Sequence, residues 1–217
     1  EVGLKHGLNV LCMAKPLAHT AGSSMHLHQS VVEQGSGQNI FSAADGQATP
    51  AFYHFIGGQQ AALAEFTLLF APHVNSYQRL CQPFASPNNA CWSEDNRAAG
   101  LRIPASAPVA RRVENRLPGA DANPYLALAA SLAAGLHGIE RQLQPSAPIQ
   151  GEFEVPDELT LPCTMHAAIE RLKRSQLARE LFGEEFVAGY LASKTLELAS
   201  FQDEITPWER RVLAAQV

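Results

Sequence analysis

Several kinds of residue are scarce in this chain of 217 residues, and each scarcity excludes a class of protein. The four cysteines, Cys12, Cys81, Cys91 and Cys163, are widely spaced, and no two of them form a Cys-x-x-Cys pair. That spacing favours free thiols in a reducing, cytoplasmic compartment over a disulfide framework or a zinc site. An arrangement with two disulfides stays open at this stage.

Positive charge is also scarce. The net charge is −5 at pH 7, whereas a general nucleic-acid binder would have a basic balance. The chain does not open with a basic and then apolar signal segment. Residues 122–139 lack Asp, Glu, Lys and Arg, but they include Asn, Pro and His, which favours a buried helix over a membrane span. We therefore expect neither a nucleic acid nor a membrane as partner.

Two catalytic signatures are missing. The sequence has no Walker-type glycine loop, so it does not predict a P-loop enzyme. It has no Gly-x-Ser-x-Gly elbow either, which leaves serine hydrolysis with little support. Candidate chemistry must come from other residue types.

Two histidines lie in the segment 22–30, which reads Gly-Ser-Ser-Met-His-Leu-His-Gln-Ser. Alternate side chains of a β-strand share a face, so His26, His28 and Ser30 point one way. Imidazoles suit Mn²⁺ or Zn²⁺, and they tolerate Mg²⁺ where carboxylates supply most of the ligands. The alternative is a pair of partly buried core histidines, and the pattern leaves both interpretations open.

Arginine is concentrated in the middle of the chain. Six of the twelve arginines, and no lysine, lie between positions 79 and 116: Arg79, Arg97, Arg102, Arg111, Arg112 and Arg116. Arginine binds carboxylate and phosphate through two parallel hydrogen bonds, whereas lysine acts as a point charge. Only three carboxylates share this window, so the arginines cannot all be neutralised within it. The pattern favours an anion site over a solvated basic face.

A second strand-like stretch, residues 111–116, places Arg112, Glu114 and Arg116 on one face. Glu114 is either an ion-pair partner of these arginines or a metal ligand whose cation contacts phosphate oxygens. A histidine face beside an Arg/Glu/Arg face is most simply explained by a metal-bound phosphate.

The coarse pattern predicts an α+β fold with antiparallel sheet strands, packed helices and a helical C-terminal third. A short helix is expected to end at Gly7, and strands are expected at 9–15, 24–32, 98–103 and 109–117. The segments 35–49 and 82–95 are predicted to be loops.

Longer helices are predicted further along the chain. Apolar residues at helical spacing predict one over 52–70, although Gly57 and Gly58 interrupt the pattern. Asn123-Pro124 predicts the start of another that ends near Leu143. A proline-rich linker over 145–162 follows, and then helices capped by Thr164 and Thr206.

Three stretches in this order, 22–30, 96–104 and 111–125, resemble the C-terminal catalytic portion of the glutamine synthetase superfamily. The surroundings of Trp92 and residues 114–121 are more similar to its γ-glutamylpolyamine (glutamate–putrescine) synthetase branch. The resemblance implies an ATP-dependent ligase. ATP would phosphorylate the γ-carboxylate of glutamate, and an amine such as putrescine would attack the γ-glutamyl phosphate. An ammonia-using glutamine synthetase, a non-catalytic scaffold of the same fold and a histidine-metal hydrolase are the alternatives.

The resemblance also implies a role for each site residue, with Mg²⁺ or Mn²⁺ as cofactor and ATP as a substrate. The metal ligands would be His26 and Glu114. ATP would be bound by His28, Ser30, Arg97, Arg102 and Arg112. Glutamate would be bound by Gly22, Arg79, Arg97 and Arg116, of which Arg97 and Arg116 would be catalytic.

The chain departs from the family pattern at three single positions and in its extent. Ala85 stands where ammonia-using members have a flap glutamate, Val109 replaces a basic nucleotide-contacting residue, and Ala21 replaces an asparagine. Residues 1–217 would be the C-terminal part of a catalytic domain, without the N-terminal β-grasp domain and most metal glutamates. We therefore expect this chain alone to bind metal and ATP weakly and not to turn over. The parent would be a ring-shaped homo-oligomer.

Overall fold

A small four-stranded sheet lies at the centre of this computed structural model, which describes residues 1–81, 86–151 and 153–216. The spatial order is β1 (Leu27–Gln29), β4 (Val113–Asn115), β3 (Leu101–Ile103) and β2 (Trp92–Glu94). β4 is antiparallel to both of its neighbours, whereas β2 is parallel to β3. The predicted α+β class is confirmed, and the sheet is mixed where an antiparallel one was predicted.

The strand register brings charged residues from three strands to one level. Glu114 on β4 pairs directly with His28 on β1 and with Arg102 on β3. On β1, Leu27 and Gln29 are buried while His28 is exposed, which confirms the predicted alternation. One face of the sheet is therefore polar and open, and the other belongs to the core.

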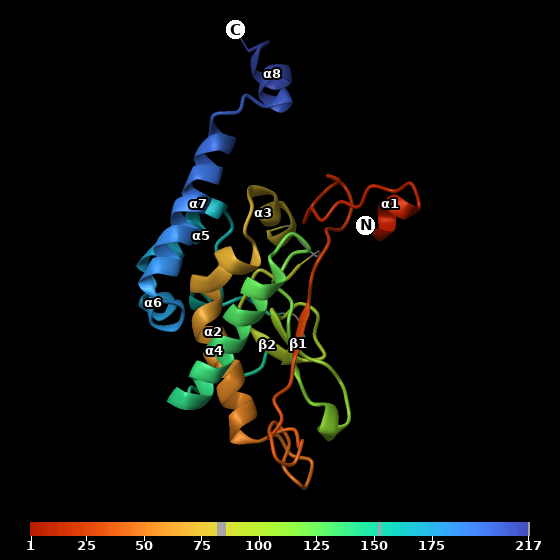
Figure 1. Cartoon of the computed structure of the whole chain (residues 1–217), viewed down its shortest axis with the longest axis vertical. Helices are drawn as coiled ribbons and strands as arrows, with labels where there is room; N and C mark the ends of the chain where they lie inside the picture. The colour runs from red at the N-terminus through yellow and green to blue at the C-terminus, as the bar shows by residue number, and fades with distance from the viewer. Residues whose placement is uncertain (82–85, 152, 217) are drawn as a thin grey trace.

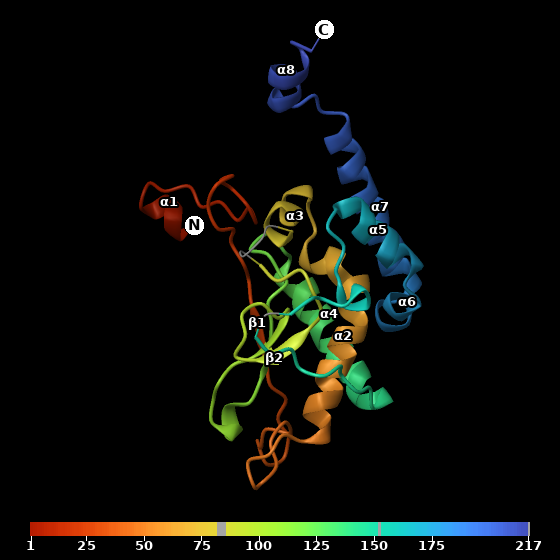
Figure 2. The same cartoon turned by 180° about the vertical axis from the view of Figure 1, so that it is seen from behind.

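Two long helices, α2 (Pro50–Phe70) and α4 (Pro124–Arg141), lie side by side and cover the core face (Figures 1 and 2). The Thr49 and Asn123 side chains cap their first turns, and a proline opens each helix. The helices cross at Gly58 and Gly138, where a Cβ on Gly58 would lie 2.6 Å from the Gly138 Cα. Glycine at this crossing allows backbone to approach backbone.

The C-terminal third of the chain is mainly helical, as predicted. α3 (Val74–Leu80) follows α2, and the C-terminal third contains α5 (Met165–Arg174), α6 (Gln176–Phe182), α7 (Glu184–Gln202) and α8 (Pro207–Leu213). Thr164 and Thr206 cap α5 and α8. α7 extends beyond the body of the molecule, and the N-terminal arm with α1 (Val2–Lys5) also projects from it (Figure 1).

The predicted strands are shorter than expected, and one is wrong. Residues 9–15 form no strand, and Val10 and Leu11 are exposed, because this arm has no ladder partner in the described part of the chain. Residues 108–110 form a 3₁₀ turn before β4 rather than part of a strand.

Two further differences concern segments predicted to be irregular. β2 lies within the predicted loop 82–95. The proline-rich linker is attached to that strand, because Ile149 N–H donates to the Trp92 carbonyl at 3.0 Å. Across the described residues, no helix combines the length and apolar character needed to cross a membrane.

Candidate functional site

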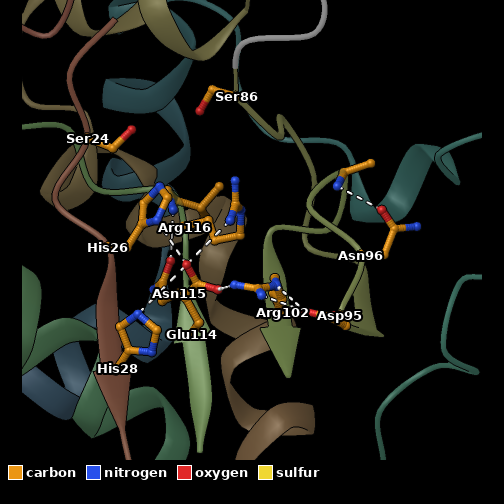
Figure 3. Close-up of polar contacts among 12 residues, drawn as sticks. Ser24, His26, His28, Ser86, Asp95, Asn96, Arg102, Glu114, Asn115 and Arg116 are labelled. Carbon is orange, nitrogen blue, oxygen red and sulfur yellow. Dashed lines mark hydrogen bonds and ion pairs between the residues drawn. The ribbon is translucent and has the colours of Figure 1, made fainter. Parts of the chain in front are cut away.

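Glu114 is the centre of the polar face (Figure 3). Its side chain is buried, and it is surrounded by groups from neighbouring strands. Arg102 Nη1 donates to Oε2 at 2.7 Å, and Arg116 Nη1 donates to Oε1 at 3.3 Å. Burial raises the pKa of Glu114, but the hydrogen bond from Arg102 and the charge of Arg116 outweigh it. The pKa therefore lies below its usual value, and the carboxylate is charged at neutral pH.

His26 is directed at the same carboxylate, with Nδ1 2.9 Å from Glu114 Oε1. Burial and the charge of Arg116 lower the pKa of His26, so the ring is neutral at neutral pH. A charged carboxylate only accepts hydrogen bonds, so Nδ1 carries the proton and Nε2 keeps a free lone pair. An imidazole held this way by a carboxylate is the arrangement found behind many metal-bound histidines.

His28 lies beside it, with Nε2 3.8 Å from Glu114 Oε1. Arg112 Nε donates to His28 Nδ1 at 3.2 Å. Because arginine can only donate, Nδ1 of His28 is the acceptor and the proton of the neutral ring is on Nε2. Both predicted histidines therefore face Glu114, and the site interpretation of the pair fits better than the core interpretation.

Arg102 extends the network towards solvent. Its Nη2 lies 2.5 Å from Asp95 Oδ1, while its Nη1 bonds Glu114. Asp95 follows β2 directly and has a φ of +47°, in the left-handed region. The hydrogen bond from Arg102 lowers the pKa of Asp95. Sequence reasoning missed this partner, for which the only signal was an Asp-Asn pair, residues typical of turns.

Positive charge exceeds negative charge on this face. Arg97 is exposed in the turn after Asp95, and its charge lowers the pKa of both Asp95 and Arg116. Arg97, Arg102, Arg112 and Arg116 together outnumber the two carboxylates. Among the described residues this face therefore carries net positive charge, and the anion site that the arginine pattern predicts stays a prediction.

Arg79, which lies against Gly22, is more deeply buried than the other arginines of this face. Arg79 is 1% exposed, and its guanidinium donates to Ser24 Oγ at 3.0 Å, to Ser86 Oγ at 2.9 Å and to the Leu117 carbonyl. A Cβ on Gly22 would lie 2.6 Å from Arg79 Cγ, so glycine leaves room for this side chain. Arg79 thus connects the segment before β1 with the segment after β4.

Two remaining positions, Ser30 and Arg111, stand apart from Glu114. Ser30 is exposed one residue beyond β1. Arg111, counted in the arginine cluster, donates instead to Ser42 Oγ at 2.7 Å and to the Gly46 carbonyl at 3.0 Å, which holds the loop 35–49. Ala85 lies outside the described residues.

The metal-binding capacity of this face is partial. His26 and Glu114 offer one imidazole nitrogen and one carboxylate, a donor set that suits Mn²⁺ or Mg²⁺ as part of a shell. Within residues 1–81, 86–151 and 153–216, no group of three or more His, Cys, Asp or Glu residues could hold a metal ion. The pair fits a metal site only when further ligands come from elsewhere.

The chain is similar to known proteins over nearly its whole length. Residues 1–213 match the family described as glutamine synthetase, catalytic domain. The chain belongs to this family. It is 39% identical over 211 residues to γ-glutamylethanolamide synthetase GlnA4 of Streptomyces coelicolor, covering 97% of this chain and 45% of the relative.

Two other relatives match nearly the whole of this chain. Identity to γ-glutamylputrescine synthetase PuuA of Escherichia coli is 36% over 205 residues, which cover 94% of this chain and 43% of that protein. The solved structure of apo GmaS without ligand superposes with a TM-score of 0.85 at 34% identity, over 99% of this chain and 50% of the other. The chain therefore spans half or less of these relatives, and the identities do not single out the polyamine branch.

Proposed function

We propose that this chain contributes part of the active site of an ATP-dependent ligase that joins the γ-carboxylate of glutamate to an amine. The convergence of His26, Arg102 and Arg116 on Glu114 is the observation that supports this most. Phosphoryl transfer from ATP to a carboxylate develops negative charge, and arginines around a metal site stabilise it.

Each residue would act from its present position. Arg97, which is exposed and forms no ion pair within the described part of the chain, would bind the transferred phosphoryl group, while His28, Ser30, Arg102 and Arg112 would contact the nucleotide. Arg116 would hold the glutamate side chain. Arg79, with Gly22, would bind glutamate by exchanging one of its serine partners for the substrate.

His26 and Glu114 would hold the divalent cation. Mg²⁺ or Mn²⁺, when bound, neutralises phosphate charge and polarises the phosphoryl oxygens. In this structure Glu114 accepts a hydrogen bond from His26 Nδ1, so a cation held by both side chains would take the place of that hydrogen bond.

The amine is proposed to be a polyamine such as putrescine. Trp92 and residues 114–121 are the basis for this choice, together with Ala85, which leaves no carboxylate for ammonium at that position. The relatives that act on ethanolamine and putrescine differ by only three percentage points in identity, from 39% to 36%, so ethanolamine is the closest competing substrate.

A second candidate is a scaffold that keeps the fold without turnover. The partial metal site of the described residues favours it for the isolated chain. We propose that residues 1–217 are the C-terminal part of a catalytic domain, whose parent is a ring-shaped homo-oligomer, and that this chain alone binds metal and ATP weakly.

The test compares the chain with a fusion in which the N-terminal half of the Streptomyces coelicolor relative precedes it. Phosphate release from ATP is measured with Mg²⁺, glutamate and either putrescine, ethanolamine or ammonia. The fusion is expected to release phosphate only when glutamate and an amine are both present, and the chain alone is expected to be inactive. Phosphate release that does not depend on glutamate would refute the ligase assignment.

A further inference from the structure

Four polar side chains are buried on the face of the sheet opposite the site. Gln29 follows His28 on β1, and Asn115 follows Glu114 on β4. Gln59 comes from α2 and Ser131 from α4, and all four are at most 8% exposed. A polar cluster inside a core is costly unless every member finds partners, so its arrangement is restrictive.

Ser131 connects the two strands through this cluster. Its hydroxyl donates to Gln29 Oε1 at 2.5 Å and accepts from Asn115 Nδ2 at 3.2 Å. Gln59 Nε2 donates to the same Gln29 oxygen at 3.0 Å. Asn115 Oδ1 also accepts from the Leu117 N–H at 3.1 Å. The residue next to His28 and the residue next to Glu114 are thus joined by one hydroxyl of α4.

These bonds exist in one strand register only. A slip of β1 by one residue turns its side chains to the wrong face, which the burial pattern already prevents. A slip by two residues keeps the faces but moves Gln29 by about 6.8 Å relative to Asn115, at about 3.4 Å per residue. Ser131 could not reach both partners after that movement, and buried polar groups would lose their bonds at about 1–3 kcal/mol each.

The register rests on a short ladder: β1 and β4 have three paired positions, and one further bridge, Ser24 with Gly119, continues the pairing before β1. A short ladder offers few backbone hydrogen bonds to hold it in place. One of those three pairs is His28 with Glu114, and His26 reaches the same carboxylate from one residue before β1.

We propose that Ser131 is a positioning residue: through Gln29 and Asn115 it fixes the register of β1 against β4, and thereby the approach of His26 and His28 to Glu114. Its importance for catalysis rests on the proposed function. The register claim itself does not, because it concerns only the chain described here.

The test uses the 217-residue chain with no ligand. Ser131→Ala is compared with Thr67→Val, which also deletes a fully buried hydroxyl, but one bonded only to the backbone of its own helix α2. Three quantities are measured at one neutral pH: the free energy of unfolding in urea, the ¹⁵N resonances of the His26 and His28 rings, and the hydrogen exchange of the β1 amides. The rings lie on the far side of the sheet from Ser131, so a purely local loss of packing does not move them.

Ser131→Ala is expected to shift the ring resonances and to speed β1 exchange roughly tenfold beyond the change in global stability. Thr67→Val is expected to lower stability and leave both signatures unchanged. Ring resonances equal to those of Thr67→Val would overturn the proposal.

A third variant keeps the test decisive if Ser131→Ala fails to fold. In it, Gln29→Leu, Gln59→Leu, Asn115→Val and Ser131→Ala together replace the cluster with apolar groups, which removes the unsatisfied polar atoms and restores stability. The proposal expects its ring resonances and β1 exchange to stay different from wild type. Wild-type signatures in this variant would mean that the cluster contributes stability alone. Because no substrate is involved, either result stands whether or not the ligase assignment holds.

Discussion

Glu114 and Arg102 are direct partners across β4 and β3, and their side chains form an ion pair at 2.7 Å on the open face of the sheet. The same carboxylate also contacts Arg116 and His26. A single buried negative charge thus holds two cations that would otherwise repel each other. Both the stability of this face and its proposed chemistry therefore depend on the Glu114 carboxylate.

Replacing this carboxylate is expected to be costly. Glu114→Gln leaves Arg102 and Arg116 without their shared partner, and breaking a buried ion pair destabilises a protein by about 3 kcal/mol. Urea unfolding at neutral pH measures the loss. The control is Asp95→Asn, which removes the exposed partner of Arg102 and is expected to cost less than about 1 kcal/mol. Equal losses in the two variants would contradict the central role of Glu114.

The helix crossing predicts opposite effects for two glycine substitutions. In Gly58→Ala the new Cβ meets the Ala134 carbonyl and the Gly138 backbone, so α2 and α4 must separate. We expect a loss of about 2 kcal/mol or more, as for other overpacked cores. Gly189→Ala, in open space on α7, is expected to gain about 0.5–1 kcal/mol from helix propensity. Thermal unfolding of both variants checks the contrast, and a stabilised Gly58→Ala would contradict the close crossing.

A second ion-pair cluster, around Glu197, predicts that the stability of the fold depends on pH. Glu197 on α7 bonds Lys194 Nζ and His73 Nδ1 at 2.8 Å and 2.7 Å. Burial raises the pKa of Glu197, but the hydrogen bonds and charges of Lys194 and His73 have the larger, opposite effect. The pKa therefore lies below its ordinary value of 4.5. Its contribution to stability is therefore present above pH 4.5 and lost as the pH falls through the lower folded-state value.

Glu197→Gln is expected to reduce the free energy of unfolding at pH 7 by less than about 1 kcal/mol, and the difference is expected to shrink towards about pH 3. Urea unfolding at both pH values measures it. Glu185→Gln, at an exposed position near the start of the same helix, serves as control. If the difference in unfolding free energy between wild type and Glu197→Gln grew in acid, the pKa of Glu197 would be raised rather than lowered in the folded state.

Arg97 offers a separation of activity from stability. It is exposed, so Arg97→Ala is expected to leave the unfolding free energy within about 0.5 kcal/mol of wild type. In the fusion described above, the same change is expected to abolish amine-dependent phosphate release, because the transferred phosphoryl group loses its arginine. Ligation that survives Arg97→Ala would show that the assigned phosphate role is wrong.

Ala85 provides the test of the amine. On the family resemblance, a glutamate at this position contributes to an ammonium site, so Ala85→Glu in the fusion is expected to raise kcat/KM for ammonia relative to putrescine. Competition assays with both amines measure the ratio, and Ala85→Gln controls for side-chain size. If the ratio of kcat/KM for ammonia to that for putrescine did not change, position 85 would not determine which amine is used.

Period-two patterns correctly predicted which side chains share a face of the sheet. The alternation at 26–30 correctly predicted that His26 and His28 share an open face, and the pattern at 111–116 placed Glu114 and Arg116 together. Short-range periodicity suffices here because both segments are extended and adjacent in the sheet. The convergence of Arg102 on Glu114 depends instead on cross-strand register, which the local pattern does not give.

Other features were beyond local patterns. β2 has only three residues, two of them buried, and its parallel partner β3 lies several residues further along the chain. Residues 9–15 are apolar enough for a strand, yet a strand exists only beside a neighbour. The bond between Ser131 and Gln29 joins residues 102 positions apart and that between Asn115 and Ser131 joins residues 16 positions apart, and nothing in any one segment predicts them.

Residues 146–149, after α4, lie along β2, the strand at the edge of the sheet, and this affects how the sheet can pair with other chains. Ile149 binds the Trp92 carbonyl, Ser93 Oγ donates to the Ile149 carbonyl at 2.7 Å, and the Trp92 indole donates to the Ser146 carbonyl at 2.7 Å. Exposed borders of sheets are the places where foreign strands add on and aggregation begins. Here a proline-rich coil already occupies that border at Trp92, and so it shields the sheet from unwanted pairing with other chains.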